Sequence, residues 1–361
     1  MFTKTSKLTF IILYVLLMFG CGSSNSTMEV ATPDNQITPP NLPPPTTNTP
    51  TPDANYQTPT EIVAALGTGI NMGNTLDAPS EGEWALAAQE YYYDAYKTAG
   101  FGHVRIPITW DKRVANQSPY EVNDDFFNRV EEIVDWAIER DFYVMINAHH
   151  ESWLKNDINA EKRARFVAIW TQVADRFKNK SSKLLFEILN EPNGMTLEQV
   201  DSLNLEVLAV IRQSNPTRSV IYSGNGYTPA EAMKQADIPN DPNIIANFHS
   251  YDPWPFAGQC TRSWGSEADR LALREIYQDV SNWSENFGIP VIVNEFGAAM
   301  YDFTQPQNIC NENDRLEYLK AHVALQKEFG IPGTVWCDGG SFQIYDRSSN
   351  TFSNALSSLI F

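Results

Sequence analysis

Positive charge is scarce in this chain of 361 residues. Lys and Arg number 26 against 44 Asp and Glu, which gives a formal net charge of −18 at pH 7. This balance opposes binding to nucleic acid and to anionic membrane surfaces, because both carry negative charge themselves. We therefore expect no nucleic-acid partner, whereas a neutral partner remains open.

Cysteine is also scarce, with four residues in the whole chain. If Cys21 is lipidated, as argued below, Cys260, Cys310 and Cys337 remain, which is an odd number. Cys337 is predicted to lie in a buried strand, whereas Cys260 and Cys310 lie in predicted loops. A bridge between Cys260 and Cys310 is the one pairing worth proposing, and three unpaired thiols are the alternative.

Sequence motifs that are typical of cofactor binding, metal binding or a nucleophilic serine are absent. The glycines of residues 69–74 do not match the GxGxxG phosphate loop of dinucleotide-binding folds. No HExxH pattern or cysteine cluster indicates a metal, and no GxSxG turn exposes a nucleophilic serine. The chain is therefore expected to use neither metal nor organic cofactor.

Long apolar runs are confined to the N-terminus. Lys4 and Lys7 precede the apolar residues 8–19, which end at Gly20 and Cys21. Residues 1–20 are therefore predicted to be a secretory signal peptide, too short for a membrane span. A cysteine directly after the small residue resembles the lipobox of bacterial lipoproteins, despite Met18 and Phe19 at positions where other residues are usual. We expect an exported protein held at the bacterial outer membrane or cell surface by a lipid on Cys21, with simple secretion as the alternative.

Residues 21–58 are predicted to be a linker, because they are rich in Pro, Thr, Ser and Asn and nearly free of apolar residues. Their proline clusters favour extended backbone, with a contour of roughly 110 Å at about 3.1 Å per residue. The remaining residues, 59–361, have the length of one α/β barrel. We expect them to form a single catalytic domain and the protein to be a monomer.

A regular alternation of short apolar runs and amphipathic helical stretches fills residues 59–361, and it is typical of repeated βα units. Eight strands are predicted, each followed by a helix, and the sequence therefore favours a (β/α)8 barrel over an open doubly wound sheet. The predicted strands are residues 68–72, 103–108, 143–148, 184–189, 219–223, 244–248, 291–293 and 334–336.

Polar and aromatic residues gather where these strands end, which is where catalytic residues of such barrels lie. In chain order these residues are Asn71, Asn74, Arg105, His149, His150, Asn190, Glu191, Asn225, His249, Tyr251, Glu295, Trp336 and Asp338. Either glutamate alone could belong to a structural ion pair. The two together, about a hundred residues apart, suit the cleavage of a glycosidic bond by one acid and one nucleophile.

The two glutamates need different pKa values for that reaction. Arg105 is expected to favour the ionised form of a neighbouring glutamate, and a tyrosine hydroxyl such as that of Tyr251 could donate to the same carboxylate. Repulsion from that anion should raise the pKa of the glutamate that faces it, which makes this second glutamate the acid. Once the nucleophile carries a sugar its charge is gone, and the acid can then act as a base toward water.

Seven short phrases in strand order resemble glycoside hydrolase family 5, the large cellulase family. They are GINMGNTL (69–76), VRIP (104–107), AHH (148–150), NEP (190–192), HSY (249–251), NEFG (294–297) and VW (335–336). Each phrase is weak alone, but together they span nearly the whole domain. Two positions depart from the family pattern: Asn294 stands where glycine is frequent, and Cys337 where a second aromatic residue is common.

The resemblance implies a role for each matching residue. Glu191 would be the acid/base and Glu295 the nucleophile of a retaining reaction. The residues implied to support them are Arg105 and Tyr251 beside Glu295, His249 beside Glu191, Asn190 at the sugar 2-hydroxyl, His149 in the −1 pocket and Trp336 as its floor. Asn74 is placed near the cleft.

Two sets of residues are ambiguous from the sequence. His149 and His150 invite a metal interpretation, but neighbours on a strand point to opposite faces, so we expect His150 to be a core or supporting group. Trp84, Trp110, Trp254 and Trp264 are candidate sugar platforms, of which one or two are expected in the cleft and the others in the core.

The sequence and the resemblance together predict an endo-acting hydrolase of β-1,4 linkages in a neutral glucan such as cellulose, carboxymethylcellulose or mixed-linkage β-glucan. A β-mannanase or xyloglucanase on the same scaffold is the first alternative. A surface glycan-binding lipoprotein without catalysis is the second, although both glutamates are present.

Overall fold

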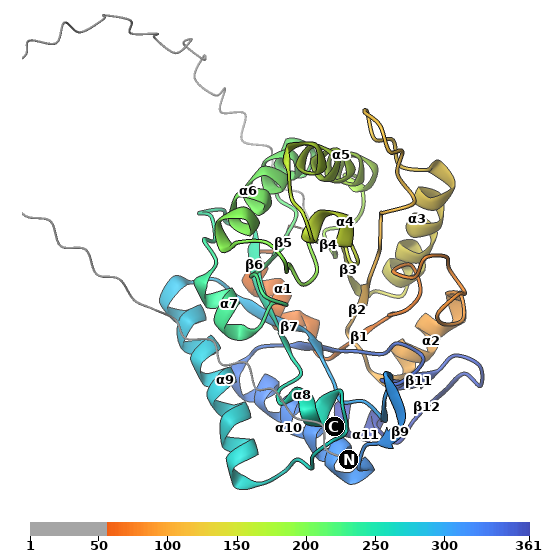
Figure 1. Cartoon of the computed structure of the whole chain (residues 1–361), viewed down its shortest axis with the longest axis vertical. Coiled ribbons are helices and arrows are strands. Elements are labelled where there is room, and N and C mark those ends of the chain that lie inside the picture. Colours follow the sequence, from red (N-terminus) through yellow and green to blue (C-terminus); the bar gives the residue numbers. More distant parts are fainter. Residues whose placement is uncertain (1–55) are drawn as a thin grey trace, which may run out of the picture. The chain divides into compact units, whose positions relative to one another are not determined.

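The computed structural model describes residues 56–361, and these residues form a closed barrel of eight parallel strands (Figure 1). The predicted signal peptide, the lipidation site at Cys21 and nearly all of the linker lie outside the described residues. The barrel closes because β1 pairs with a strand on each side: Gly69 lies opposite His103 of β2 and Thr334 of β10. The (β/α)8 architecture predicted from the sequence is therefore confirmed.

The eight barrel strands occur in the predicted order, and each strand end lies within three residues of the predicted end. They are β1 (Gly69–Asn71), β2 (His103–Ile106), β3 (Tyr143–Asn147), β4 (Leu184–Glu187), β5 (Val220–Ser223), β6 (Ile244–Ser250), β7 (Val291–Phe296) and β10 (Gly333–Val335). Two small hairpins lie outside the barrel, β8 (Tyr301–Asp302) with β9 (Gln305–Ile309), and β11 (Tyr345–Asp346) with β12 (Thr351–Phe352). Neither hairpin was predicted from the sequence.

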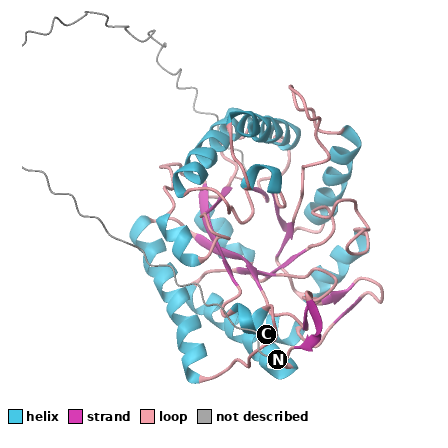
Figure 2. Ribbon diagram, in the orientation of Figure 1, coloured by secondary structure: helices cyan, strands magenta, loops and turns pink. Residues whose placement is uncertain are grey.

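Helices surround the ring of strands (Figure 2). The long ones begin at side-chain caps: Ser266 and Thr196 each form a capping box, and Gly288 and Gly330 end two helices in the left-handed conformation. The helices are α1 (Pro59–Leu66), α2 (Glu90–Ala99), α3 (Asp124–Glu139), α4 (Ser152–Lys155), α5 (Ala160–Phe177), α6 (Leu197–Ser214), α7 (Ala230–Gln235), α8 (Trp254–Ala257), α9 (Glu267–Phe287), α10 (Glu312–Phe329) and α11 (Leu356–Leu359). Among the described residues, no helix is long and apolar enough to cross a membrane.

The barrel interior is layered. Its lower layer is apolar, and α1 closes that end of the barrel by packing on it (Figure 1). The inward residues of this layer are Met145, Leu185, Ile221, Ile245 and Ile292. Two positions further along each strand, the same inward face carries buried polar groups: Asn147, Glu187, Ser223, Asn247 and Asn294. The side chains of the candidate site stand on this polar layer.

One irregularity in β7 reorients its last residues. Phe248 lies opposite Val293, yet the next residue, His249, lies opposite Glu295, so Asn294 is an extra residue in β7. The pairing of β7 with β10 shifts over the same stretch. With Ile292 facing inward, simple alternation would point Glu295 toward the helices. The bulge at Asn294 turns it into the barrel mouth, as bulges beside active sites often do.

Candidate active site

A cleft of about 1030 Å³ lies at the C-terminal ends of the strands and contains both glutamates. Nine site residues were predicted from the sequence, namely the two glutamates and the seven residues expected to support them. Eight of the nine either line this cleft or contact a residue that lines it. The predicted residues that line it are Asn74, His149, Glu191, His249, Tyr251, Glu295 and Trp336. Arg105 lies fully buried beneath them.

Glu295 is held by two donors, as the sequence analysis predicted. Arg105 Nη1 donates to its Oε1 at 2.6 Å, and the Tyr251 hydroxyl donates to its Oε2 at 3.0 Å. Burial and the charge of Glu295 keep the pKa of Tyr251 well above its ordinary value, so the hydroxyl keeps its proton and remains a donor. Both carboxylate oxygens of Glu295 therefore have fixed positions.

Glu187 is an important partner that the sequence analysis missed. Its two oxygens accept from Arg105 Nε at 2.6 Å and Nη2 at 2.7 Å, and neither side chain is exposed. Burial works against the charged form of Arg105, but the charges of Glu187 and Glu295 outweigh it and raise the pKa of Arg105. A glutamate two residues after the inward-facing Leu185 was the available signal, because a buried carboxylate needs a partner.

Asn190 and Asn71 complete the surroundings of the guanidinium. Arg105 Nη2 donates to Asn190 Oδ1 at 2.7 Å, and Nη1 donates to Asn71 Oδ1 at 2.9 Å. Because Asn190 Oδ1 accepts from Arg105, its amide nitrogen is left as the donor group of that side chain. Asn190 is therefore the ninth predicted residue in the assembly, joined to Glu295 through Arg105.

Glu191 stands in a less enclosed position than Glu295. Its backbone has φ 42°, in the left-handed region that residues other than glycine rarely adopt, and Pro192 follows it. Asn193 Nδ2 donates to the Glu191 carbonyl at 2.8 Å, which holds this turn. The Glu191 side chain is 28% exposed against 6% for Glu295, so it faces the open cleft.

His249 lies between the two carboxylates, with Nδ1 2.8 Å from Glu191 Oε1 and 3.5 Å from Glu295 Oε2. Burial lowers the pKa of His249, but the charge of Glu295 and the hydrogen bond with Glu191 outweigh it and raise that pKa. The predicted position of His249 beside Glu191 agrees with the structure. The three groups hold oxygen and nitrogen atoms within 4.8 Å of one another.

The two glutamate pKa values are shifted in the opposite directions to those predicted from the sequence. Burial raises the pKa of Glu295 above its ordinary value, against the charges of His249 and Arg105. Burial also acts to raise the pKa of Glu191, but the hydrogen bond from His249 reverses the direction and lowers it. The prediction considered Arg105 and Tyr251 but neither the depth of Glu295 nor a charged His249 beside Glu191.

His149 has a defined tautomer. The Ile108 N–H donates to Asn147 Oδ1 at 3.0 Å, so Asn147 Nδ2, 3.1 Å from His149 Nδ1, must be a donor to that nitrogen. The proton of the neutral ring is then on Nε2. Burial, with the charges of His150 and Arg105, holds the pKa of His149 well below its ordinary value, so the ring is neutral. His149 thus offers an N–H donor to the cleft.

Trp336 forms the cleft floor beside His149, with the two rings parallel within 3° and their centroids 5.8 Å apart. Gly73 makes this possible, since an added Cβ there would lie 2.7 Å from Trp336 Cζ2. A flat aromatic in this position can bury the C–H face of a sugar.

The prediction that His150 is a core or supporting group is wrong. Its side chain is half exposed and lines the cleft, next to Trp84 at a ring-centroid distance of 5.7 Å. Because β3 ends at Asn147, the alternation of a strand no longer applies to His149 and His150. Their rings meet edge to face at 4.5 Å.

Two groups among residues 56–361 have the geometry to hold a metal ion: Asp77 with His149 and His150, and Glu191 with His249 and Glu295. In the first group Asp77 already accepts the N–H groups of Asn74 and Thr75. His149 Nδ1 accepts from Asn147, which leaves the proton on its other nitrogen. The donor set of the first group is therefore already used within the protein.

The four tryptophans divide as expected, two in the cleft and two in the core. Trp84 and Trp254 line the cleft and are 48% and 42% exposed. Trp110 and Trp264 are buried. The sequence could not assign them individually, because all four lie in loops or at their edges.

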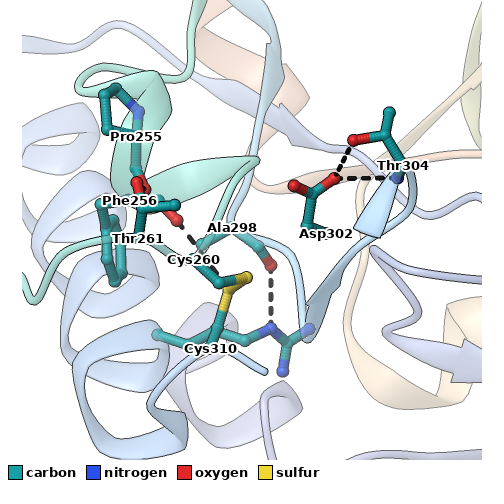
Figure 3. The surroundings of a disulfide bond; sticks show 9 residues. Pro255, Phe256, Cys260, Thr261, Ala298, Asp302, Thr304 and Cys310 are labelled. Carbon is teal, nitrogen blue, oxygen red and sulfur yellow. Dashed lines mark hydrogen bonds between the residues drawn. A yellow bond between two sulfur atoms is a disulfide. The ribbon is translucent and has the colours of Figure 1, made fainter. Parts of the chain in front are cut away.

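The Cys260–Cys310 disulfide is present (Figure 3). Cys337 is a buried free thiol. This is the pairing proposed from the sequence, and the alternative of three unpaired thiols is wrong. Cys337 lies two residues beyond β10 rather than within a strand.

Comparison with known proteins connects this geometry to one family. A family model described as cellulase (glycosyl hydrolase family 5) matches residues 65–340. Endoglucanase H of Acetivibrio thermocellus is 39% identical over 310 residues, which cover 84% of this chain and 33% of that protein. Endoglucanase A of Ruminococcus albus is 32% identical over 329 residues, covering 81% of this chain and 88% of that protein.

The structural neighbours agree with the sequence relatives. Endoglucanase Cel5A of Thermotoga maritima superimposes with a TM-score of 0.79 at 33% identity, covering 84% of this chain and all of that one. Structures of the same protein are described in complex with mannotriose and with cellobiose. The matched part of this chain corresponds to 33% and 55% of the first two curated relatives. The chain belongs to glycoside hydrolase family 5.

Proposed function

We propose that this protein hydrolyses internal β-1,4 linkages of a β-glucan with retention of configuration, with Glu295 as nucleophile and Glu191 as acid/base. The observation that carries the proposal is the approach of the two carboxylates, which have oxygens within 4.8 Å of each other. Retaining enzymes hold their carboxyl groups about 5–5.5 Å apart, whereas inverting ones need about 6.5–9.5 Å to admit a water. Relatives named endoglucanase support the glucan.

In the first step a Glu295 oxygen attacks the anomeric carbon of the sugar that rests on Trp336. The bond from that carbon to the leaving oxygen breaks, and the oxygen takes the proton of Glu191. Arg105 and Tyr251 fix the attacking carboxylate, so little reorganisation is needed at the moment of reaction. The Asn190 amide is placed to donate to the 2-hydroxyl, a bond that strengthens in the transition state.

In the second step Glu191 removes a proton from a water whose oxygen attacks the same anomeric carbon. The ester bond to Glu295 breaks, the carboxylate regains its charge, and the sugar leaves with its original configuration. Both steps balance with side chains, substrate and water alone, so the proposed reaction needs no metal and no cofactor.

His249 can supply the proton that Glu191 needs in order to act as the acid. His249 Nδ1 lies 2.8 Å from Glu191 Oε1, where a protonated His249 can pair with the Glu191 anion. Transfer of one proton from Nδ1 to Oε1 turns this pair into a neutral imidazole and a neutral carboxylic acid. Substrate that displaces water from the cleft favours the neutral pair, because a low-polarity surrounding disfavours separated charges.

A β-mannan is the second candidate substrate. The specific reason is that Thermotoga maritima Cel5A, at 33% identity, is described with mannotriose as well as with cellobiose. Asn190 is the donor that we assign to the 2-hydroxyl, and glucose and mannose differ in configuration at that position. Xyloglucan remains a third possibility on the same cleft.

The setting proposed for the enzyme follows from the N-terminal sequence. We propose export, a lipid on Cys21 as the membrane attachment, and a linker of residues 21–58 that holds a monomeric catalytic domain away from the membrane. Incorporation of labelled palmitate into wild-type protein but not into Cys21→Ser would support the anchor, and equal labelling would exclude it.

Product sizing on a panel of soluble polysaccharides tests the activity. Carboxymethylcellulose, barley β-glucan, xyloglucan and mannan are digested, and early products are sized. The proposal expects mixed oligosaccharides from barley β-glucan and carboxymethylcellulose, and faster release from these two than from mannan or xyloglucan. Release of a single short product would contradict the proposed endo action, and a preference for mannan would contradict the proposed substrate.

A further inference from the structure

The disulfide lies under one wall of the cleft. Cys260 follows α8 on the loop after β6, and Cys310 directly follows β9 on the loop after β7 (Figure 3). The bridge therefore ties together two loops that approach each other only in the folded barrel. Both loops carry aromatic side chains into the cleft: Trp254 on the first, and Tyr301 and Phe303 on the second. We call these three residues the hairpin wall.

Backbone hydrogen bonds reinforce the same junction. The Ala299 N–H donates to the Ala257 carbonyl at 2.7 Å, which joins the hairpin base to α8. The Cys310 N–H donates to the Met300 carbonyl at 2.9 Å and closes the neck of the hairpin. The disulfide thus lies where backbone hydrogen bonds already hold the two loops together.

Apolar packing connects the disulfide to the catalytic floor. Cys310, Ala299 and Phe342 form a small buried cluster, on which Tyr251 and Trp336 also pack. Tyr251 donates to Glu295, and its ring meets the Trp254 ring edge to face at 6.1 Å. The hairpin wall is therefore joined to the cleft floor rather than free to swing.

Two of the wall residues are exposed although large and apolar. Phe303, at the hairpin tip, is 61% exposed, and Trp254 is 42% exposed. The tip is fixed by Asp302, whose Oδ1 accepts from the N–H and the hydroxyl of Thr304 (Figure 3). Gly258 leaves room for the Trp254 ring, since an added Cβ there would lie 2.3 Å from the indole. Rigid exposed aromatics that face a cleft are suited to stacking on a sugar.

The position of the wall along the cleft follows from strand order. The barrel runs β4, β5, β6, β7 and then β10. Glu191, which must touch the leaving oxygen, follows β4, and Trp254 follows β6. Trp84, by contrast, follows β1 on the far side of Trp336 and lies against His150. The wall and Trp84 therefore stand on opposite sides of Trp336, because β10 lies between β1 and β7, and they would contact opposite ends of a bound chain.

We propose that the Cys260–Cys310 disulfide holds the hairpin wall as a binding site for the sugar units on the leaving-group side, and so sets the preference for long chains. This inference rests on the proposed hydrolysis of a β-glucan. The disulfide acts as a positioning element: it touches no substrate, and its effect passes through Trp254 and Phe303.

The test compares two substrates in the oxidised and reduced protein. Dithiothreitol reduces the bridge, so Cys260 and Cys310 each gain a hydrogen while the reagent is oxidised to its cyclic disulfide. Cellohexaose occupies both sides of the cleft, whereas an aryl β-cellobioside places only its small aryl group beyond the cleavage point. We expect reduction to raise KM for cellohexaose about fivefold, the scale of one lost aromatic contact, and to leave kcat/KM for the aryl cellobioside within about twofold.

The double variant Cys260→Ser with Cys310→Ser assigns the effect. It should behave as the reduced protein does and should no longer respond to dithiothreitol, although Cys337 is still present. Equal KM for cellohexaose in the oxidised and reduced forms would overturn the proposal. So would a loss of aryl cellobioside activity as large as that of cellohexaose, because the bridge would then support the fold or the floor alone.

A surface variant keeps the test decisive if the cysteine variant does not fold. Phe303→Ala removes an exposed side chain and should reproduce the selective rise in KM for cellohexaose, whereas unchanged KM would refute the wall. Phe287→Ala is the matched control, since Phe287 is 66% exposed at the end of α9 and does not line the cleft. Hydrolysis of the aryl cellobioside by the oxidised protein tests the proposed function itself, so the two failures are distinguishable.

Discussion

The floor of the cleft and its walls are built on different parts of the fold. The floor includes strand-end residues such as Arg105, Asn190 and Glu295, which are buried and joined by hydrogen bonds over the polar layer of the barrel. The walls consist of loop residues such as Trp84 and Phe303, exposed and held by local turns. In the proposed mechanism the floor performs the reaction, and the walls select the chain that reaches it.

The largest effects should follow changes in the floor. We expect Glu295→Gln and Glu191→Gln each to reduce kcat on barley β-glucan by about 10⁴-fold or more, as losses of groups that act as a unit do. Each amide keeps the shape of the side chain, so the thermal unfolding midpoint should stay near that of the wild type. Reducing-sugar release measures the first quantity. Turnover near the wild-type rate in either variant would remove that residue from the proposed mechanism.

Breaking the ion pair beneath the floor should affect stability as well as activity. Glu187→Ala leaves the Arg105 guanidinium partly unpaired in a fully buried place, and we expect a loss of about 3–5 kcal/mol in the free energy of unfolding. Urea unfolding measures it. The control is Glu206→Gln, which removes a partly exposed pair with Arg163 and should cost less than about 1 kcal/mol. Equal losses in the two variants would contradict the special position of Glu187.

Two tryptophan variants test the same difference between buried residues and exposed cleft residues. Trp110→Ala should cost about 3–5 kcal/mol of stability, because the side chain is fully buried and leaves a cavity. Trp84→Ala should leave stability within about 0.5 kcal/mol and raise KM for cellohexaose about fivefold. Unfolding curves and initial rates on both variants suffice. A large stability loss in Trp84→Ala would show that this part of the wall is core.

The smallest expected effect concerns the pH dependence of stability at His249. Because the folded state raises the pKa of His249, its charged form stabilises the fold below the ordinary imidazole pKa of about 6.5, and this contribution disappears as the pH rises through the folded-state value. The stability difference between wild type and His249→Gln should therefore be larger at pH 5.5 than at pH 8.5. A difference that grows toward pH 8.5 would show that His249 is neutral in the folded protein.

The same division explains what the sequence could predict. Strand periodicity placed Arg105, Glu191 and Glu295 at strand ends, because a two-residue repeat determines which side chains share a face. It could not show that β3 stops at Asn147, which frees His150 to face the cleft, or that a bulge at Asn294 turns Glu295 inward. Both depend on hydrogen bonds between strands.

Most of the structure of the cleft walls could not be predicted from the sequence. The β8–β9 hairpin is short, and β9 begins with Gln305, Pro306 and Gln307, so no apolar alternation predicts a strand there. Its position depends on contacts with α8 and on the disulfide, which join segments about fifty residues apart. The pKa order of the glutamates depends likewise on burial depth, which becomes visible only when the barrel is closed.

The most direct test of the account is to trap the sugar on the protein. A 2-deoxy-2-fluoro aryl β-cellobioside slows both steps, and the covalent intermediate can then be located by mass spectrometry of proteolytic peptides. The account predicts one added disaccharide on the peptide that contains Glu295, and none on Glu295→Gln. A label on Glu191, or hydrolysis of the unmodified substrate with inversion and no label at all, would contradict it.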